Sequence, residues 1–100
     1  MKGIKEVKFR DYDCIVVQKG FYRNKMPALQ LLDKENNNPI ATATVFILGY
    51  TPETPKHTLI KNYSENEGIL NCLIEHGIVE DTGKSVKSGF VTCPIVKILI

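Results

Sequence analysis

One stretch of sequence predicts the helix that decides the fold, Tyr63-Ser64-Glu65-Asn66-Glu67-Gly68-Ile69-Leu70-Asn71-Cys72-Leu73-Ile74-Glu75-His76-Gly77-Ile78-Val79. Ser64 and Glu67 have the spacing of a capping box, in which each side chain bonds the backbone N–H of the other residue at a helix start. Apolar residues then recur at intervals of three and four, which lines one helix face. Gly77 stands where a left-handed residue commonly ends a helix. We therefore predict one helix over about residues 65–76, which is too short to be stable unless it packs on other elements.

The chain before this helix reads as strands and turns. Residues 5–10 alternate polar and apolar side chains, and residues 14–18 are rich in β-branched residues, which favours a hairpin. In the strand predicted at residues 40–47 we expect the threonines to face solvent. The fold is therefore predicted to be α+β, an antiparallel β-meander of four to six strands packed against one α-helix (about residues 65–76). The remaining strands of the meander are predicted at 28–33 and 57–62.

The chain after the helix is predicted less regularly. Residues 81–84 read as a turn and residues 85–89 as a short, weak segment. The final apolar run from Phe90 to Ile100 contains Pro94, which cannot donate a hydrogen bond to a sheet. We therefore expect this last strand to be split, bulged or at a sheet edge, where it could pair with a second copy of the chain.

Length and composition indicate one soluble-type domain. The chain has 100 residues, of which 43% are hydrophobic, so residues 1–100 are predicted to form a single domain. The net charge of +2 is small for a nucleic-acid-binding protein, although residues 1–25 carry seven Lys/Arg against three acidic residues. No apolar run suits a signal peptide or a membrane span. Three cysteines without close spacing favour reduced thiols, and hence a cytoplasmic protein.

Candidate catalytic and metal-binding residues are few. Cys72 and His76 are four apart and share a helix face, which suits two metal ligands, but no second Cys/His pair matches them. A buried thiol beside a helix-end histidine is the stronger explanation of both residues. A nucleophilic cysteine would need a histidine base nearby in space, and the spacings do not show which residues meet. We therefore predict no catalytic residue, no metal ligand and no cofactor, and a protein that is not an enzyme. The residues considered as nucleophile or base are Cys14, Cys72, Cys93, His57 and His76.

A polar corner, residues 61–67, lies where a strand is predicted to meet the helix. Backbone N–H groups at such positions often hold ligands. The two glutamates of the first helical turn would repel an anion, so a cation, an amine or the backbone of another protein fits this corner better than a phosphate does. The residues predicted to form a binding site there are Lys61, Asn62, Tyr63, Glu65 and Asn66.

A basic loop, residues 19–25, offers an alternative site. It interleaves aromatic and basic side chains, the combination that stacks on bases and follows the backbone of single-stranded nucleic acid. A solvated hairpin loop has the same composition. The residues predicted to contact nucleic acid in this alternative are Lys19, Phe21, Tyr22, Arg23 and Lys25.

The polar corner also carries a family resemblance. The segments 61–68, 73–79, Thr82-Gly83 and Gly89-Phe90-Val91 resemble a family of small uncharacterised proteins, a domain of unknown function, from bacterial plasmids, conjugative elements and phages. Similarity extends to Tyr12-Asp13-Cys14 and to residues 41–45, and so covers most of the chain. The resemblance implies accessory genes of mobile elements as the setting, without an activity that could be assigned to any residue.

These observations predict a small binding module rather than an enzyme. We expect a protein partner, with a host or defence component or a second copy of this chain as candidates, and no membrane association. The surfaces expected to carry binding are the corner Asn62–Asn66 and an edge strand ending at Ile100. The alternative is a nucleic-acid-binding accessory protein that uses residues 19–25, and the two differ in salt dependence because phosphate contacts release counterions.

Overall fold

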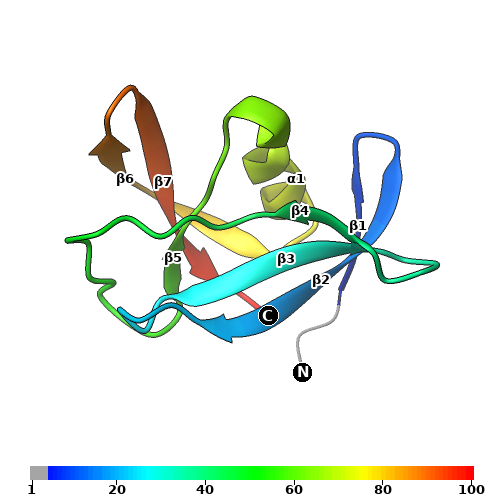
Figure 1. The fold of residues 1–100 in the computed structure, drawn as a ribbon, viewed down its shortest axis with the longest axis horizontal. Helices are drawn as coiled ribbons and strands as arrows, with labels where there is room; N and C mark the ends of the chain where they lie inside the picture. Colours follow the sequence, from blue (N-terminus) through cyan, green and yellow to red (C-terminus); the bar gives the residue numbers. More distant parts are fainter. Residues whose placement is uncertain (1–4) are drawn as a thin grey trace.

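A computed structural model describes residues 5–100 and contains two antiparallel sheets and one short α-helix (Figure 1). In chain order the elements are β1 (Lys5–Phe9), β2 (Tyr12–Phe21), β3 (Pro27–Asp33), β4 (Pro39–Thr42), β5 (His57–Leu59), a 3-10 turn η1 (Ser64–Asn66), α1 (Ile69–Glu75), β6 (Val79–Ser88) and β7 (Val91–Ile98). The strand orders are β1-β2-β3-β4 and β5-β7-β6. The predicted α+β class is confirmed. Residues 1–4 of the predicted single domain lie outside the described residues.

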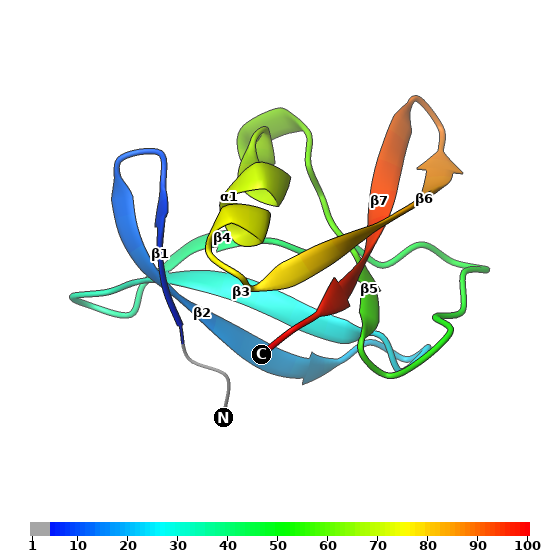
Figure 2. The same cartoon turned by 180° about the vertical axis from the view of Figure 1, so that it is seen from behind.

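The helix sits between two hairpins. The β1–β2 hairpin rises on one side of α1 and the β6–β7 hairpin on the other, while β3 and β4 cross beneath it (Figure 1). The same arrangement is visible from behind, where β2 and β3 form the floor (Figure 2). Ile69 and Leu73 of α1 are fully buried in the main core. Burying each such side chain contributes roughly 1.5–3 kcal/mol, which explains how a helix of seven residues is stable here.

The first hairpin is longer than predicted. β2 continues to Phe21, so the first three residues of the basic loop belong to a strand, and the pairing with β3 shifts between Gln18 and Phe21. Gly20 has a φ of 100° at this irregularity, a conformation that glycine adopts without strain. Within residues 19–25, which are predicted as a loop, Gly20 therefore marks a bulge in a strand. Tyr22 to Met26 then form the tight connection to β3, closed by a hydrogen bond from Tyr22 N to Met26 O of 2.8 Å.

The fourth strand is shorter than predicted. β4 ends at Thr42, and Thr44 makes an isolated bridge to Ile60. The expectation that the threonines face solvent is wrong for Thr44, which is 3% exposed. Its hydroxyl is satisfied inside the protein, because Oγ1 lies 2.9 Å from the Tyr22 hydroxyl and accepts a hydrogen bond of 3.2 Å from Leu29 N.

The predicted start of the helix is wrong. Ser64 has a φ of 55° and lies in η1, and α1 begins only at Ile69, after Gly68 with a φ of 94°. The side chain that satisfies the first N–H groups is Asn62, whose Oδ1 accepts hydrogen bonds of 3.2 Å from Gly68 N and 3.0 Å from Leu70 N. The capping-box motif does not form because this asparagine, lying before the motif, occupies the helix start instead.

The predicted end of the helix is confirmed. Gly77 has a φ of 71°. Its N–H donates to Ile74 O at 3.1 Å, and the N–H of Ile78 donates to Leu73 O at 2.9 Å. These two hydrogen bonds form a Schellman motif, which satisfies carbonyls at the end of the helix and turns the chain into β6.

The last strand is not at an edge. β7 lies between β5 and β6, which corrects the expectation drawn from Pro94. The carbonyl of Pro94 accepts a hydrogen bond from Ile60 N at 3.1 Å and so faces β5. Because the nitrogen and the carbonyl of one strand residue point the same way, the Pro94 nitrogen faces the β5 side too. Pairing with β5 ends at Ile95. Its missing N–H therefore breaks no bond to β6. Residues 81–89, predicted as a turn and a weak segment, belong mostly to β6, whose register shifts between Asp81 and Lys84.

Candidate functional site

The helical segment from η1 to α1 satisfies backbone groups on both edges of the four-stranded sheet. At one edge, Asn66 Nδ2 donates a hydrogen bond of 2.7 Å to the carbonyl of Thr42 in β4. At the other edge, the thiol of Cys72 donates to the carbonyl of Lys8 in β1 at 3.2 Å. Exposed edge strands invite pairing with other chains. The segment therefore satisfies one backbone carbonyl on each edge of the sheet while it covers the core.

Cys72 and His76 share a helix face, as predicted, and both contact the backbone of Lys8 in β1. His76 Nδ1 donates to Cys72 O at 2.7 Å, so the other nitrogen, Nε2, is the acceptor for Lys8 N at 3.5 Å. Burial raises the pKa of the Cys72 thiol above its ordinary value. With the thiol held protonated and both ring nitrogens engaged, this pair is poorly suited to nucleophilic catalysis.

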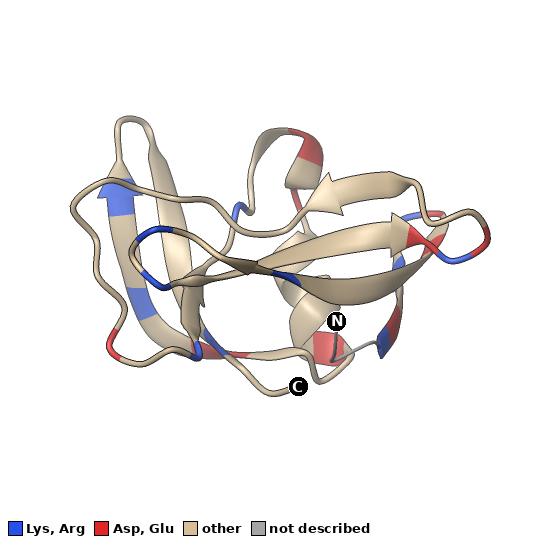
Figure 3. Ribbon diagram, turned by 60° about the horizontal axis from the view of Figure 1, so that its bottom comes forward, with Lys and Arg blue, Asp and Glu red and all other residues tan. Residues whose placement is uncertain are grey.

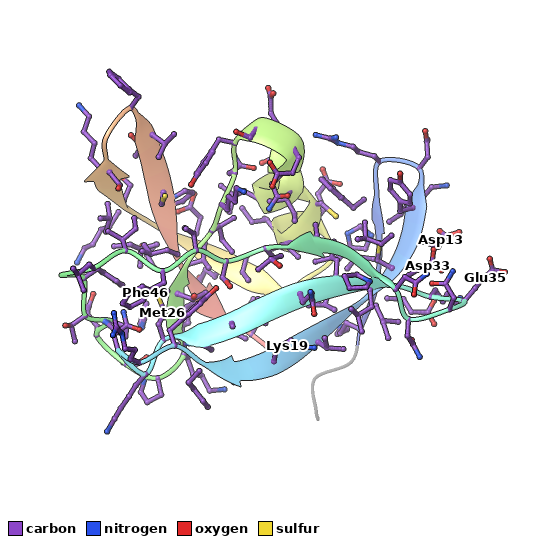
Figure 4. The ribbon with its side chains drawn as sticks, in the orientation of Figure 1. Asp13, Lys19, Met26, Asp33, Glu35 and Phe46 are labelled. Atoms are coloured by element: carbon purple, nitrogen blue, oxygen red, sulfur yellow. The ribbon has the colours of Figure 1, made fainter. Side chains whose placement is uncertain are left out.

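The other cysteines and the acidic residues make no metal centre within residues 5–100. No group of three or more His, Cys, Asp or Glu side chains in that range is placed to hold a metal ion. Burial raises the pKa of the Cys14 and Cys93 thiols as well. Asp13, Asp33 and Glu35 lie together at one end of the sheet, opposite Met26 and Phe46 (Figure 4). There Asp33 Oδ1 accepts from the N–H groups of Glu35 and Asn36, at 2.8 and 3.4 Å, which shapes the β3–β4 turn.

The predicted polar corner is assembled, and three of its five predicted residues line one groove. Lys61 Nζ and Glu65 Oε2 form an ion pair of 2.6 Å, and Nζ also lies 5.7 Å from the ring centre of Tyr63. The hydrogen bond between them raises the pKa of Lys61 and lowers that of Glu65. Tyr63 packs against a small second core, and Asn62 caps α1, so these two residues have structural roles.

The corner groove has a volume of about 330 Å³ and runs between β4 and the polar corner. Beside Lys61, Glu65 and Asn66, it is lined by Gln30 of β3 and by residues 39–42 of β4. Two buried side-chain oxygens, Gln30 Oε1 and Asn66 Oδ1, have no hydrogen-bond partner among the described residues. Leaving one such acceptor unpaired costs about 1–3 kcal/mol. Within residues 5–100, the fold itself supplies no donor to either oxygen.

Sequence reasoning did not find Gln30. It lies on a strand in which its neighbours Leu29 and Leu31 are fully buried in the main core, so the alternation marks it only as a polar position on the other face of the strand. A glutamine at such a position is common, and only the approach of the polar corner across β4 makes it part of a groove. The local pattern carried no signal for that contact.

Of the five residues predicted to bind nucleic acid in the basic loop, Tyr22 and Arg23 pack against other residues and the remaining three are exposed. Tyr22 is built into the fold, since its hydroxyl bonds Thr44 and its ring packs 5.7 Å from that of Phe46. Arg23 lies over the Phe46 ring, with its Cζ 5.5 Å from the ring centre. Lys19, Phe21 and Lys25 are exposed. Figure 3 marks the positions of basic residues in blue on the ribbon of this loop and of β6.

Phe21 borders a second groove, the apolar groove, of about 400 Å³. Ile100, which was expected to end an edge strand, lies beyond β7 and lines this groove with Ile98. The expected edge for pairing at Ile100 is therefore absent from residues 5–100, and the C-terminal apolar residues form part of a concave surface instead.

Comparisons with protein-family models, with curated proteins and with solved structures gave no match. The resemblance to the uncharacterised family of mobile elements therefore stays a prediction. Within residues 5–100, every helix is too short or too polar to cross a membrane.

Proposed function

We propose that this protein is a non-enzymatic binding module that takes a segment of a partner protein in the corner groove. The observation that carries the proposal is the pair of unpartnered buried oxygens of Gln30 and Asn66 beside that groove. Unpaired buried acceptors lower stability in the free protein and are paired when a partner delivers hydrogen-bond donors. A binding role accounts for their presence.

The edge of β4 favours an extended segment as the occupant. The carbonyl of Thr42 faces Asn66, away from β3, and in a strand the N–H of a residue points the same way as its carbonyl. The Thr42 N–H is therefore directed toward the groove side of β4. A partner chain lying along β4 can accept from this N–H and donate to the unpaired oxygens, which is the geometry of strand addition to a sheet edge.

The setting of the protein is proposed on weaker grounds. Cys14, Cys72 and Cys93 are free and buried, which supports a reducing compartment such as the cytoplasm. The family resemblance supports an accessory gene of a plasmid, conjugative element or phage. The partner is then a host or defence protein, or a second copy of this chain.

Selection of displayed random peptides on the full chain tests the proposal. We expect selected peptides to shift the amide resonances of Thr42, Lys61 and Asn66 in NMR spectra. Peptides that shift only residues elsewhere, or a failure to select any sequence, would count against it. Thr42→Pro removes the edge N–H and Thr42→Val keeps it, so binding should be lost in the first variant and retained in the second. Unfolding of both variants in urea separates lost binding from lost folding.

A second candidate function is binding of single-stranded nucleic acid at the basic loop. Phe21 is 59% exposed, a large fraction for an aromatic side chain, and Lys19 and Lys25 are exposed near it. Base stacking on such a ring contributes about 1–3 kcal/mol per base. If this function operates, affinity for a labelled oligonucleotide falls steeply between 50 and 200 mM salt, roughly in proportion to the number of phosphate contacts, and Phe21→Ala weakens it. Salt-insensitive or absent binding would remove this candidate.

A further inference from the structure

We infer that the group which the corner groove takes from its partner is the guanidinium of an arginine side chain. The inference rests on the proposed function and names the chemistry of its occupant. It follows from three observations on the groove. Its unpaired polar atoms are oxygens, Glu65 is paired with Lys61, and Lys61 leaves the oxygens of Gln30 and Asn66 unpaired.

The free polar atoms are acceptors. Asn66 is 1% exposed, and its Nδ2 is committed to the Thr42 carbonyl, so the unpartnered end of this amide is its oxygen. The unpartnered atom of Gln30 is also an oxygen. Glu65 also lines the groove, and its carboxylate adds further acceptor oxygens. An occupant must therefore supply several donors, and an anion such as phosphate has none to give.

The resident ammonium does not complete this set. Lys61 Nζ reaches Glu65 at 2.6 Å, while both amide oxygens remain unpaired. An ammonium presents its donors around one point, whereas a guanidinium presents five N–H donors in a planar fork and is more weakly hydrated. Arginine can thus serve a carboxylate and neighbouring amide oxygens together. Its desolvation is also less costly than that of a second lysine.

The ring of Tyr63 can hold the ammonium of Lys61 after it is displaced from Glu65. This ammonium already lies 5.7 Å from the centre of the Tyr63 ring, where a cation remains favourably placed after it leaves Glu65. Glu65 is an exposed residue, so its carboxylate is reached from solvent. As the guanidinium takes Glu65, Lys61 withdraws toward the Tyr63 ring and leaves room in the groove that it shares with Gln30 and Asn66.

The test is an NMR titration of the full-length chain with N-acetylarginine methylamide, followed at the backbone amides and at the side-chain amide groups of Asn66 and Gln30. N-acetylcitrulline methylamide is the matched probe, because it has nearly the same shape and no charge. N-acetyllysine methylamide, with a free side-chain amine, carries the same charge without the planar set of donors of a guanidinium. It therefore separates the effect of charge from that of donor geometry. We expect saturable shifts at Asn66, Gln30 and Glu65 with the arginine probe, and about tenfold weaker binding of the other two.

The matched variant is Glu65→Gln, which keeps the shape of an exposed side chain and removes its charge. It should weaken the arginine probe by about tenfold. Equal binding of the citrulline probe, an unchanged affinity in Glu65→Gln, or shifts confined to the acidic residues Asp13, Asp33 and Glu35 would overturn the inference.

Failure of this inference is distinguishable from failure of the proposed function. If selected peptides bind the corner groove but the arginine probe does not, the groove binds protein by another chemistry. If the arginine probe shifts Asn66 and Gln30 as expected while peptide selection gives nothing at β4, the recognition of a guanidinium stands and the extended-segment proposal falls.

Discussion

Asn66 and Cys72 lie in one helical segment and hydrogen-bond to the two opposite edges of one sheet. Asn66 reaches the carbonyl of Thr42 in β4 at 2.7 Å, and Cys72 reaches the carbonyl of Lys8 in β1 at 3.2 Å. The same segment that covers the core thus satisfies one backbone carbonyl on each edge. Only at β4 does this leave unpaired oxygens next to a groove, which is why the binding site is proposed there and not at β1.

The helix start should depend on Asn62 and not on Ser64. Asn62→Ala leaves the N–H groups of Gly68 and Leu70 without their acceptor, so the free energy of unfolding should fall by about 1 kcal/mol. Ser64→Ala should change it by less than about 0.5 kcal/mol. Urea unfolding of both variants measures the difference. A larger effect at Ser64 would mean that the capping box predicted from the sequence forms after all.

The buried Cys72 thiol should make stability depend on alkaline pH. Its pKa is raised above the ordinary 9.0 by burial, so above that pH the unfolded chain loses the proton while the folded protein retains it. Loss of the proton from the unfolded chain favours unfolding. The protonated Cys72 thiol therefore contributes fully to the free energy of unfolding below about pH 9, and this contribution is lost as the pH rises. We expect the stability difference between wild type and Cys72→Ala to narrow from pH 8 to pH 10. A difference that stays constant or widens would show that the thiol ionises as easily in the folded protein.

Hydrogen exchange tests the central position of β7. Because β7 has a partner on both sides from Ile95 to Lys97, all amides of that segment should exchange slowly. In β6, whose outer side is unpaired in its sheet, alternate amides between Ser85 and Ser88 should exchange quickly. Alternation of fast and slow amides at 95–97 would place β7 at an edge, as Pro94 suggested from the sequence.

Local patterns predicted the parts of the fold that local contacts decide. The helix end at Gly77 and the first strand follow from neighbouring residues, and both were predicted from the sequence. The helix start depends on hydrogen bonds from Gly68 N and Leu70 N to the side chain of Asn62, across η1. The sequence also contains the capping-box spacing of Ser64 and Glu67, and local pattern alone does not show which of the two forms. The position of β7 depends on where β5 stops relative to Pro94, and no pattern within β7 encodes that.

The candidate site was predicted in outline only. The sequence pointed to Lys61, Glu65 and Asn66 because their density of polar groups is visible along the chain. It gave structural residues, Asn62 and Tyr63, the same weight, because a cap and a packed ring are distinguishable only in three dimensions. Gln30 was missed because it reaches the groove from another strand, far away in sequence.

Stability and binding should respond in opposite directions at Gln30. Gln30→Met keeps most of the side-chain volume and removes the unpaired buried oxygen, so the free protein should become more stable by about 1 kcal/mol. The same change removes an acceptor that the proposed partner uses, so affinity for a selected peptide should fall by about tenfold. Gln18→Met in β2 is the control, because no unpaired buried oxygen is found at that residue among those described.

The most direct measurement is therefore the free energy of unfolding of Gln30→Met beside its affinity for the peptide selected on wild-type protein. We expect a gain in stability together with a loss of affinity, and neither change in Gln18→Met. A loss of stability with unchanged affinity would show that the Gln30 oxygen serves the fold, and would contradict the proposal that the corner groove is a binding site.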